Sequence, residues 1–112
     1  MVPAVTEDEL DGYRGQQRYP DDTVVRVFCM RTTDETYASG WAYKLHYGVL
    51  EPTEETLDDG TIRRYDNSHE DTKGHELHVA PDPEPEIIEF PGMVELWNRF
   101  WTEVPNDEFE VP

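Results

Sequence analysis

The chain has 112 residues, enough for one domain built around one hydrophobic core. Its 26 acidic residues outnumber its 9 basic residues and give a net charge of −17, which argues against non-specific binding to DNA or to an anionic membrane. The sequence contains one cysteine, Cys29, so an internal disulfide and a multi-cysteine metal site are both excluded.

The composition also indicates where the protein works. Lysine occurs twice and arginine seven times, and acid-rich, lysine-poor chains are typical of proteins from salt-adapted cells. In molar salt the Debye length falls to about 3 Å, so repulsion among the acidic groups is screened. The N-terminus lacks the basic and apolar regions of a signal peptide, and no apolar stretch approaches the ~20 residues of a membrane span. We therefore expect a cytoplasmic protein of a halophile.

Three segments of the chain differ in their patterns. Residues 1–22 are polar and show no sustained hydrophobic period, so we expect a loosely ordered N-terminal arm. Residues 23–104 hold the patterned apolar runs and predict a single α+β domain. Residues 105–112 form an acidic tail for which we expect disorder.

Hydrophobic patterns predict the strands. Residues 24–31 are rich in β-branched side chains, and their nearly continuous apolar run is typical of a central strand. Residues 41–49 alternate large apolar side chains with a second set that includes Lys44 and His46, so the two sets point to opposite faces of a sheet. Further strands are predicted at residues 61–66, at residues 75–80 and, as an edge strand or extended segment, at residues 87–90.

A helix is predicted at the end of the domain. Apolar residues recur at helical spacing from Met93 to Val104, and Pro91 suits the start of a helix because its missing N–H is not needed there. We expect Trp97 and Trp101 to pack against the sheet. The fold class is therefore α+β: an antiparallel meander of four to five strands backed by one C-terminal helix, since the short connections favour antiparallel neighbours.

One window collects side chains that are suited to chemistry. Three of the four histidines lie within ten residues, just after two adjacent arginines. Histidine titrates near neutrality and moves protons, whereas arginine binds phosphate through two parallel hydrogen bonds. Together they suit metal-independent RNA cleavage, in which histidines transfer protons and an arginine stabilises the phosphorane. The candidate catalytic residues are Arg64, Asp66, Asn67, His69, His75 and His78.

The same window has simpler interpretations. Asp66, Asn67 and Ser68 form a good turn sequence, and the arginines could serve only to neutralise nearby acids. His75 and His78 are three residues apart, so a straight strand places them on opposite faces, which argues against one shared metal ion. We therefore predict neither a metal nor a cofactor.

The motif resembles a known family. The run from Arg64 to His69 (Arg-Tyr-Asp-Asn-Ser-His), followed by Gly-His-Glu-Leu-His at residues 74–78, is similar to the "R-Y/W-D-N-A-x-H … H-x-H" signature of the TumE-like toxin family and related small archaeal proteins. Residues 41–47 look like the family's strand of alternating aromatics, and the resemblance covers roughly residues 24–104. It implies a toxin-type component of a toxin–antitoxin pair, with a small DNA-binding antitoxin as partner. The histidines and arginines of the same window point to RNA as a candidate substrate.

Two other functions fit the composition. The first is a non-enzymatic acidic adaptor that binds a protein partner through its sheet. The second is a nucleic-acid mimic whose carboxylates stand where phosphates would lie.

The charge generates a first prediction. We expect the melting midpoint to rise by more than about 5 °C between dilute buffer and molar KCl, a change that corresponds to roughly 1 kcal/mol for a domain of this size. The physical reason is that salt screens the repulsion among a net charge of −17. Thermal melts at several KCl concentrations measure the effect, and a midpoint independent of salt would contradict the halophile interpretation.

Overall fold

The computed structural model describes residues 5–68 and 74–104. Along the chain, the helices and strands are α1 (Glu7–Leu10), β1 (Tyr13–Arg18), β2 (Thr23–Arg31), β3 (Trp41–Val49), β4 (Thr61–Asp66), β5 (His75–Val79), β6 (Glu86–Ile88) and α2 (Met93–Glu103). The predicted acidic tail at residues 105–112 lies outside the described residues.

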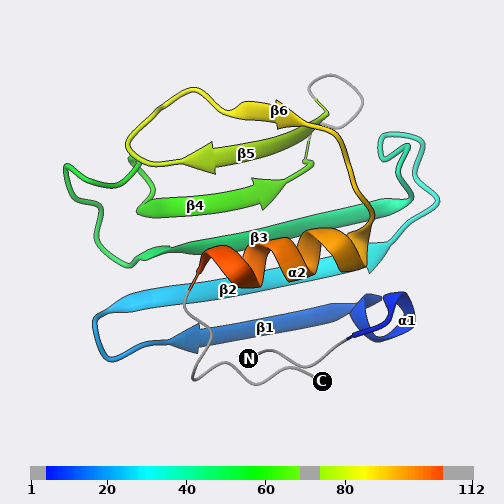
Figure 1. The fold of residues 1–112 in the computed structure, drawn as a ribbon, viewed down its shortest axis with the longest axis horizontal. Coiled ribbons are helices and arrows are strands. Elements are labelled where there is room, and N and C mark those ends of the chain that lie inside the picture. Colours follow the sequence, from blue (N-terminus) through cyan, green and yellow to red (C-terminus); the bar gives the residue numbers. More distant parts are fainter. Residues whose placement is uncertain (1–4, 69–73, 105–112) are drawn as a thin grey trace.

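The strands form one antiparallel sheet in the order β1-β2-β3-β4-β5-β6, and α2 crosses one face of it (Figure 1). The predicted α+β class, the antiparallel meander and the C-terminal helix are therefore confirmed. The predicted number of strands was wrong, because the sheet has six strands rather than four to five. The additional strand is β1, which lies within residues 1–22.

The hydrophobic pattern did not predict β1, because the sequence of this strand is polar. Its six residues alternate between half-buried and exposed positions, and only Tyr13 joins the hydrophobic core. The strand is held by backbone pairing with β2, which runs from Tyr13 opposite Cys29 to Arg18 opposite Val24. A polar edge strand of this kind leaves little trace in a hydrophobic pattern, since its stability comes from the neighbouring strand.

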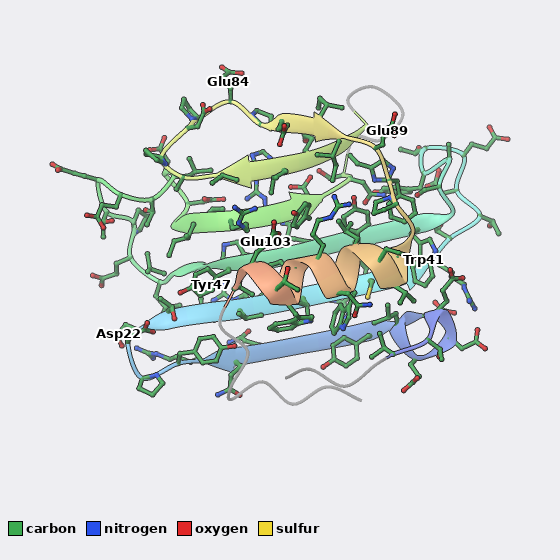
Figure 2. The ribbon with its side chains drawn as sticks, in the orientation of Figure 1. Asp22, Trp41, Tyr47, Glu84, Glu89 and Glu103 are labelled. Atoms are coloured by element: carbon green, nitrogen blue, oxygen red, sulfur yellow. The ribbon has the colours of Figure 1, made fainter. Side chains whose placement is uncertain are left out.

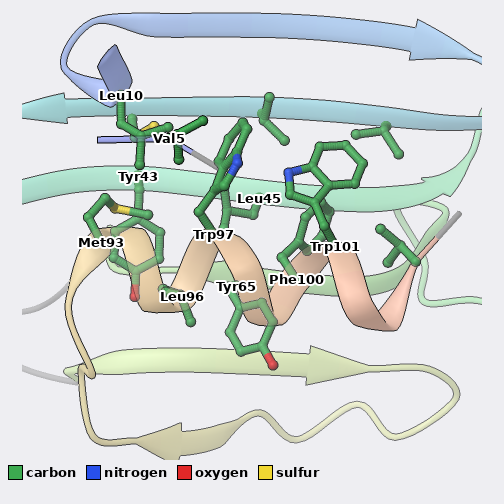
Figure 3. Close-up of a cluster of buried hydrophobic side chains, with 14 of the residues drawn as sticks. Val5, Leu10, Tyr43, Leu45, Tyr65, Met93, Leu96, Trp97, Phe100 and Trp101 are labelled. Carbon is green, nitrogen blue, oxygen red and sulfur yellow. The ribbon is translucent and has the colours of Figure 1, made fainter. Parts of the chain in front are cut away.

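The aromatic stripe of α2 forms the centre of the core (Figure 3). Trp97 and Phe100 are fully buried, and Trp101 is 4% exposed. Trp97 packs edge-on against both Tyr13 and Trp101, with ring centroids 5.4 and 5.6 Å apart. These contacts confirm the predicted burial of the two tryptophans. The free Cys29 is also fully buried, and burial raises the pKa of its thiol to about 12, which disfavours the reactive thiolate.

Polar contacts attach the end of α2 to the sheet. The Tyr65 hydroxyl donates a hydrogen bond of 2.6 Å to Glu103, and Arg63 forms an ion pair of 3.2 Å with the same carboxylate. Both partners come from β4, so these contacts tie the C-terminal end of the helix to that strand. No helix in the described ranges is long and apolar enough to cross a membrane.

The sheet therefore has two different faces. The helix face packs against α2, whereas the open face, on the other side, is covered by no helix in the described part of the chain. Acidic side chains such as Asp22, Glu84 and Glu89 project from the loops around the rim (Figure 2). Side chains on the open face come from alternate residues of the strands: Arg14, Arg26, Phe28, Lys44, His46, Arg64, Asp66, Glu76 and His78.

The packing of α2 generates a second prediction. Replacing Trp97 with Ala should destabilise the domain by about 3–5 kcal/mol, because it removes the largest fully buried side chain and leaves a cavity. Urea unfolding in molar KCl measures the change. Ile87→Ala is the control, since Ile87 is 58% exposed and its truncation should cost little. Equal losses in the two variants would contradict the core assignment.

Candidate functional site

Strand pairing assembles the site on the open face. Arg26 lies opposite His46, His46 opposite Arg64, and Arg64 opposite His78. Directly opposed residues of an antiparallel pair share a face, with their Cβ atoms about 5 Å apart. One row of two arginines and two histidines therefore crosses β2, β3, β4 and β5.

Arg64 connects this row to two carboxylates. Its Nε donates to Asp66 Oδ2 at 2.8 Å, and its Nη1 donates to Asp59 Oδ2 at 2.8 Å. Burial opposes ionisation of Asp59, but hydrogen bonds from Thr61 and Arg64 hold the pKa of its carboxyl at about 2. Two carboxylates thus fix a guanidinium that is only 17% exposed.

A bulge in the sheet brings Asp59 close to Arg64. The register between β3 and β4 shifts at Tyr47 and Gly48, where the Gly48 backbone approaches Gly60 so closely that a Cβ on Gly48 would collide with the Gly60 carbonyl. Gly60 itself has φ +87°, a conformation that favours glycine. The two glycines therefore let the β3–β4 loop fold back towards Arg64.

Asp66, Glu76 and His78 form the second part of the site. Asp66 lies opposite Glu76, and both residues are buried, at 3% and 6% exposure. His78 Nε2 lies 3.4 Å from Asp66 Oδ2 and 4.0 Å from Glu76 Oε1. One ligand atom from each of the three residues lies within 4.8 Å of the others, so the set could hold a divalent metal ion. Arg64 already occupies the Asp66 oxygen that faces His78, and a metal ion would have to displace it or share that oxygen.

His46 contributes a neutral imidazole. It is 9% exposed, and its Nδ1 has no hydrogen-bond partner among the described residues. Burial, with a further contribution from the positive charge of Arg64, lowers the pKa of His46 to about 4. At neutral pH His46 therefore carries no charge, although it stands between two arginines.

The predicted catalytic residues do not all meet. Arg64, Asp66 and His78 converge on the open face. His75 lies on the helix face, where it stacks on Phe90 and its Nδ1 is 2.7 Å from the Tyr43 hydroxyl. The two histidines of β5 thus lie on opposite faces, as their spacing indicated.

Asn67 lies outside this cluster. The Asn67 amide donates to the Trp41 carbonyl at 2.6 Å and accepts from the Tyr43 N–H at 3.0 Å, so it joins the end of β4 to β3. At 1% exposure, Asn67 holds two strands in register and cannot reach a substrate on the open face. His69 lies outside the described residues.

Sequence reasoning missed several neighbours of Arg64. The sequence patterns did not single out Asp59, Glu76 or Arg26 as site residues, and they placed Lys44 only on the strand face opposite the large apolar side chains. Strand alternation could have placed Glu76 and Lys44 on the face of Arg64. Asp59 carried no such signal, because loop closure between two glycines brings it to the site.

Comparison with known families identifies the chain. Residues 3–108 match the family described as toxin TumE. The protein belongs to the toxin TumE family. No curated protein and no solved structure matches it. The match supports a toxin-like role in general, and the motif that resembles TumE-like proteins can now be placed on the fold. In this TumE-family protein Arg64 and Asp66 of that motif bond to each other on the open face, while Asn67 joins the strands that carry them.

The buried imidazole of His46 generates a third prediction. Unfolded His46 takes up a proton near pH 6.5 and folded His46 near pH 4, so its contribution to stability is complete above pH 6.5 and is lost as the pH falls towards 4. Between pH 7 and pH 5 this loss amounts to about 2 kcal/mol. His46→Gln should remove it, and urea unfolding of both proteins at the two pH values measures the difference. Identical pH dependence in the two proteins would show that folding does not lower the pKa of His46.

Proposed function

We propose that this TumE-family protein is the toxin component of a toxin–antitoxin pair and that it cleaves RNA on its open face without a metal ion. The observation that carries the proposal is the convergence of Arg64, Asp66 and His78: a guanidinium, a carboxylate and an imidazole held together by contacts of 2.8 and 3.4 Å. The family match supports the toxin role.

The three groups suit cleavage by the neighbouring ribose hydroxyl. His78 takes the proton of the 2′-hydroxyl, and the oxygen attacks the adjacent phosphorus. Asp66 Oδ2 lies 3.4 Å from Nε2 of His78 and stabilises the positive charge that the imidazole gains. The P–O5′ bond then breaks and leaves a 2′,3′-cyclic phosphate and a 5′-hydroxyl. His69 of the motif is the proposed donor of the proton to the departing oxygen.

Arg64 stabilises the negative charge of the phosphorane. Its Nε and Nη1 are bonded to Asp66, Asp59 and Thr61, whereas Nη2 has no hydrogen-bond partner within the described ranges. The guanidinium is therefore held in position with one nitrogen available for a phosphate oxygen. Such preorganised donors act on charge that develops in the transition state.

The proposed partner is a small DNA-binding antitoxin. A DNA-binding protein carries a basic surface, and a chain with a net charge of −17 complements it. The proposed setting is the cytoplasm of a salt-adapted cell, where the pair would be held by contacts that survive strong screening.

The fourth prediction uses the two adjacent arginines as a matched pair. Arg64→Gln and His78→Ala should each lower the rate of RNA cleavage by at least about 10²-fold and abolish growth arrest on expression. Arg63→Gln should keep both activities, because Arg63 points to the helix face and pairs with Glu103. Cleavage of a single-stranded RNA by purified protein in molar KCl is the measurement.

Folding must be followed in parallel, since Arg64 pairs with a buried carboxylate. Melting curves show whether a variant is folded under the assay conditions, and His78→Ala provides a variant that keeps the Arg64–Asp66 pair. If folded His78→Ala arrests growth and cleaves RNA as well as the parent, the catalytic role fails. A parent protein that arrests growth without cleaving RNA would instead favour the adaptor.

A further inference from the structure

A pocket of about 290 Å³ lies on the open face beside the proposed catalytic groups. Arg26 from β2, Lys44 and His46 from β3, and Arg64 from β4 line it, and Asp59 closes the side next to the β3–β4 loop. The pocket shares Arg64 with the proposed catalytic site but extends away from His78, towards β2.

The charge of this pocket is opposite to that of the protein. Three cations and the Asp59 carboxylate line it, and with Asp66, which pairs with Arg64, the local net charge is +1 in a chain whose net charge is −17. Arg64 is paired with acids, but within residues 5–68 and 74–104 neither Arg26 nor Lys44 lies within 4.0 Å of a carboxylate oxygen. Because acids outnumber bases nearly threefold, two neighbouring cations without an acidic partner indicate a place kept for an external anion.

His46 supplies a second, independent observation. It lines the same pocket, nine-tenths of it is buried, and its Nδ1 has no hydrogen-bond partner in the described part of the chain. A buried polar atom without a partner costs about 1–3 kcal/mol. A ligand that carries oxygen atoms would remove this cost, because a neutral imidazole can donate a hydrogen bond from one nitrogen and accept one at the other.

We propose that this pocket is a phosphate subsite, in which Arg26, Lys44 and His46 hold the phosphodiester next to the one that reacts at Arg64 and His78. The proposal rests on the proposed function and adds the path that the RNA substrate takes across the sheet. A single RNA strand would run across the sheet from β2 to β4, over two strand spacings of together about 10 Å.

High salt explains why a built pocket is needed. At molar ionic strength the Debye length is about 3 Å, so a diffuse basic surface attracts RNA only weakly. Groups in direct contact with a phosphate still bind it, and arginine does so with fixed geometry. An acidic halophile protein therefore needs its few cations gathered at the contact points.

The first experiment uses inorganic phosphate as the probe. The imidazole resonances of His46 are followed by NMR during a phosphate titration, at a KCl concentration where every variant is folded. We expect a saturable shift in the parent and in Arg99→Ala, and at least tenfold weaker binding in Arg26→Ala and Lys44→Ala. Arg99 is the matched control because it is exposed on α2, across the sheet from the pocket. No shift, or equal shifts in all four proteins, would overturn the subsite.

The second experiment separates the subsite from catalysis. Binding of a single-stranded RNA is measured in His78→Ala at several salt concentrations, alone and combined with each of the three substitutions. Arg26→Ala or Lys44→Ala should each lose one phosphate contact, which reduces the slope of log K against log[salt] by about 0.7. Arg99→Ala should leave the slope unchanged. Equal slopes in all the variants would refute the assigned contacts.

The two proposals can fail separately. If the parent binds phosphate at His46 but neither binds nor cleaves RNA, the phosphate site stands and RNA cleavage fails. If the parent cleaves RNA while Arg26→Ala and Lys44→Ala bind RNA and phosphate like Arg99→Ala, cleavage stands and the subsite fails.

Discussion

The packing of α2 against the sheet is the interaction on which the rest of the structure depends. Trp97 and Phe100 are fully buried against one face of the sheet, and the contacts of Glu103 with Tyr65 and Arg63 set the position of the helix. In a strand, successive side chains alternate between the two faces, so burying one face decides the environment of every strand residue. A shift of one residue in register would move His46 and Arg64 into the core.

A second constraint holds the register where the site is built. The amide of Asn67 bonds to both Trp41 and Tyr43, in the buried junction between β3 and β4. That junction keeps His46 opposite Arg64, and the next pairing keeps Arg64 opposite His78. The motif from Arg64 to His69 therefore combines two roles: Arg64 and Asp66 present charge on the open face, and Asn67 keeps the strands aligned beneath them.

Charge is distributed unevenly over the molecule. Acidic side chains occupy the loops around the sheet, where water and salt can solvate them (Figure 2). The arginines on the helix face and at its edge are used within the protein, as in the pairs of Arg63 with Glu103 and of Arg31 with Asp8. On the open face, Arg26 and Lys44 keep their charge available, and this contrast is the physical basis for placing an anionic ligand there.

The sequence by itself determined the class of the fold, the strands β2 to β5 and the aromatic helix, because large apolar residues must be buried and their spacing reveals the period of the element. It also determined that His75 and His78 lie on opposite faces, since the geometry of a strand leaves no alternative. Only the tertiary structure decided that β1 is a strand, because its pairing partner stabilises it and its own composition does not. Only the tertiary structure also placed Asp59 beside Arg64 and showed that the Asn67 amide joins β4 to β3. It likewise aligned Arg26 and His46 in one row with Arg64. These relations join residues that are far apart in the chain, and local patterns carry no information about which strands become neighbours or where a loop closes.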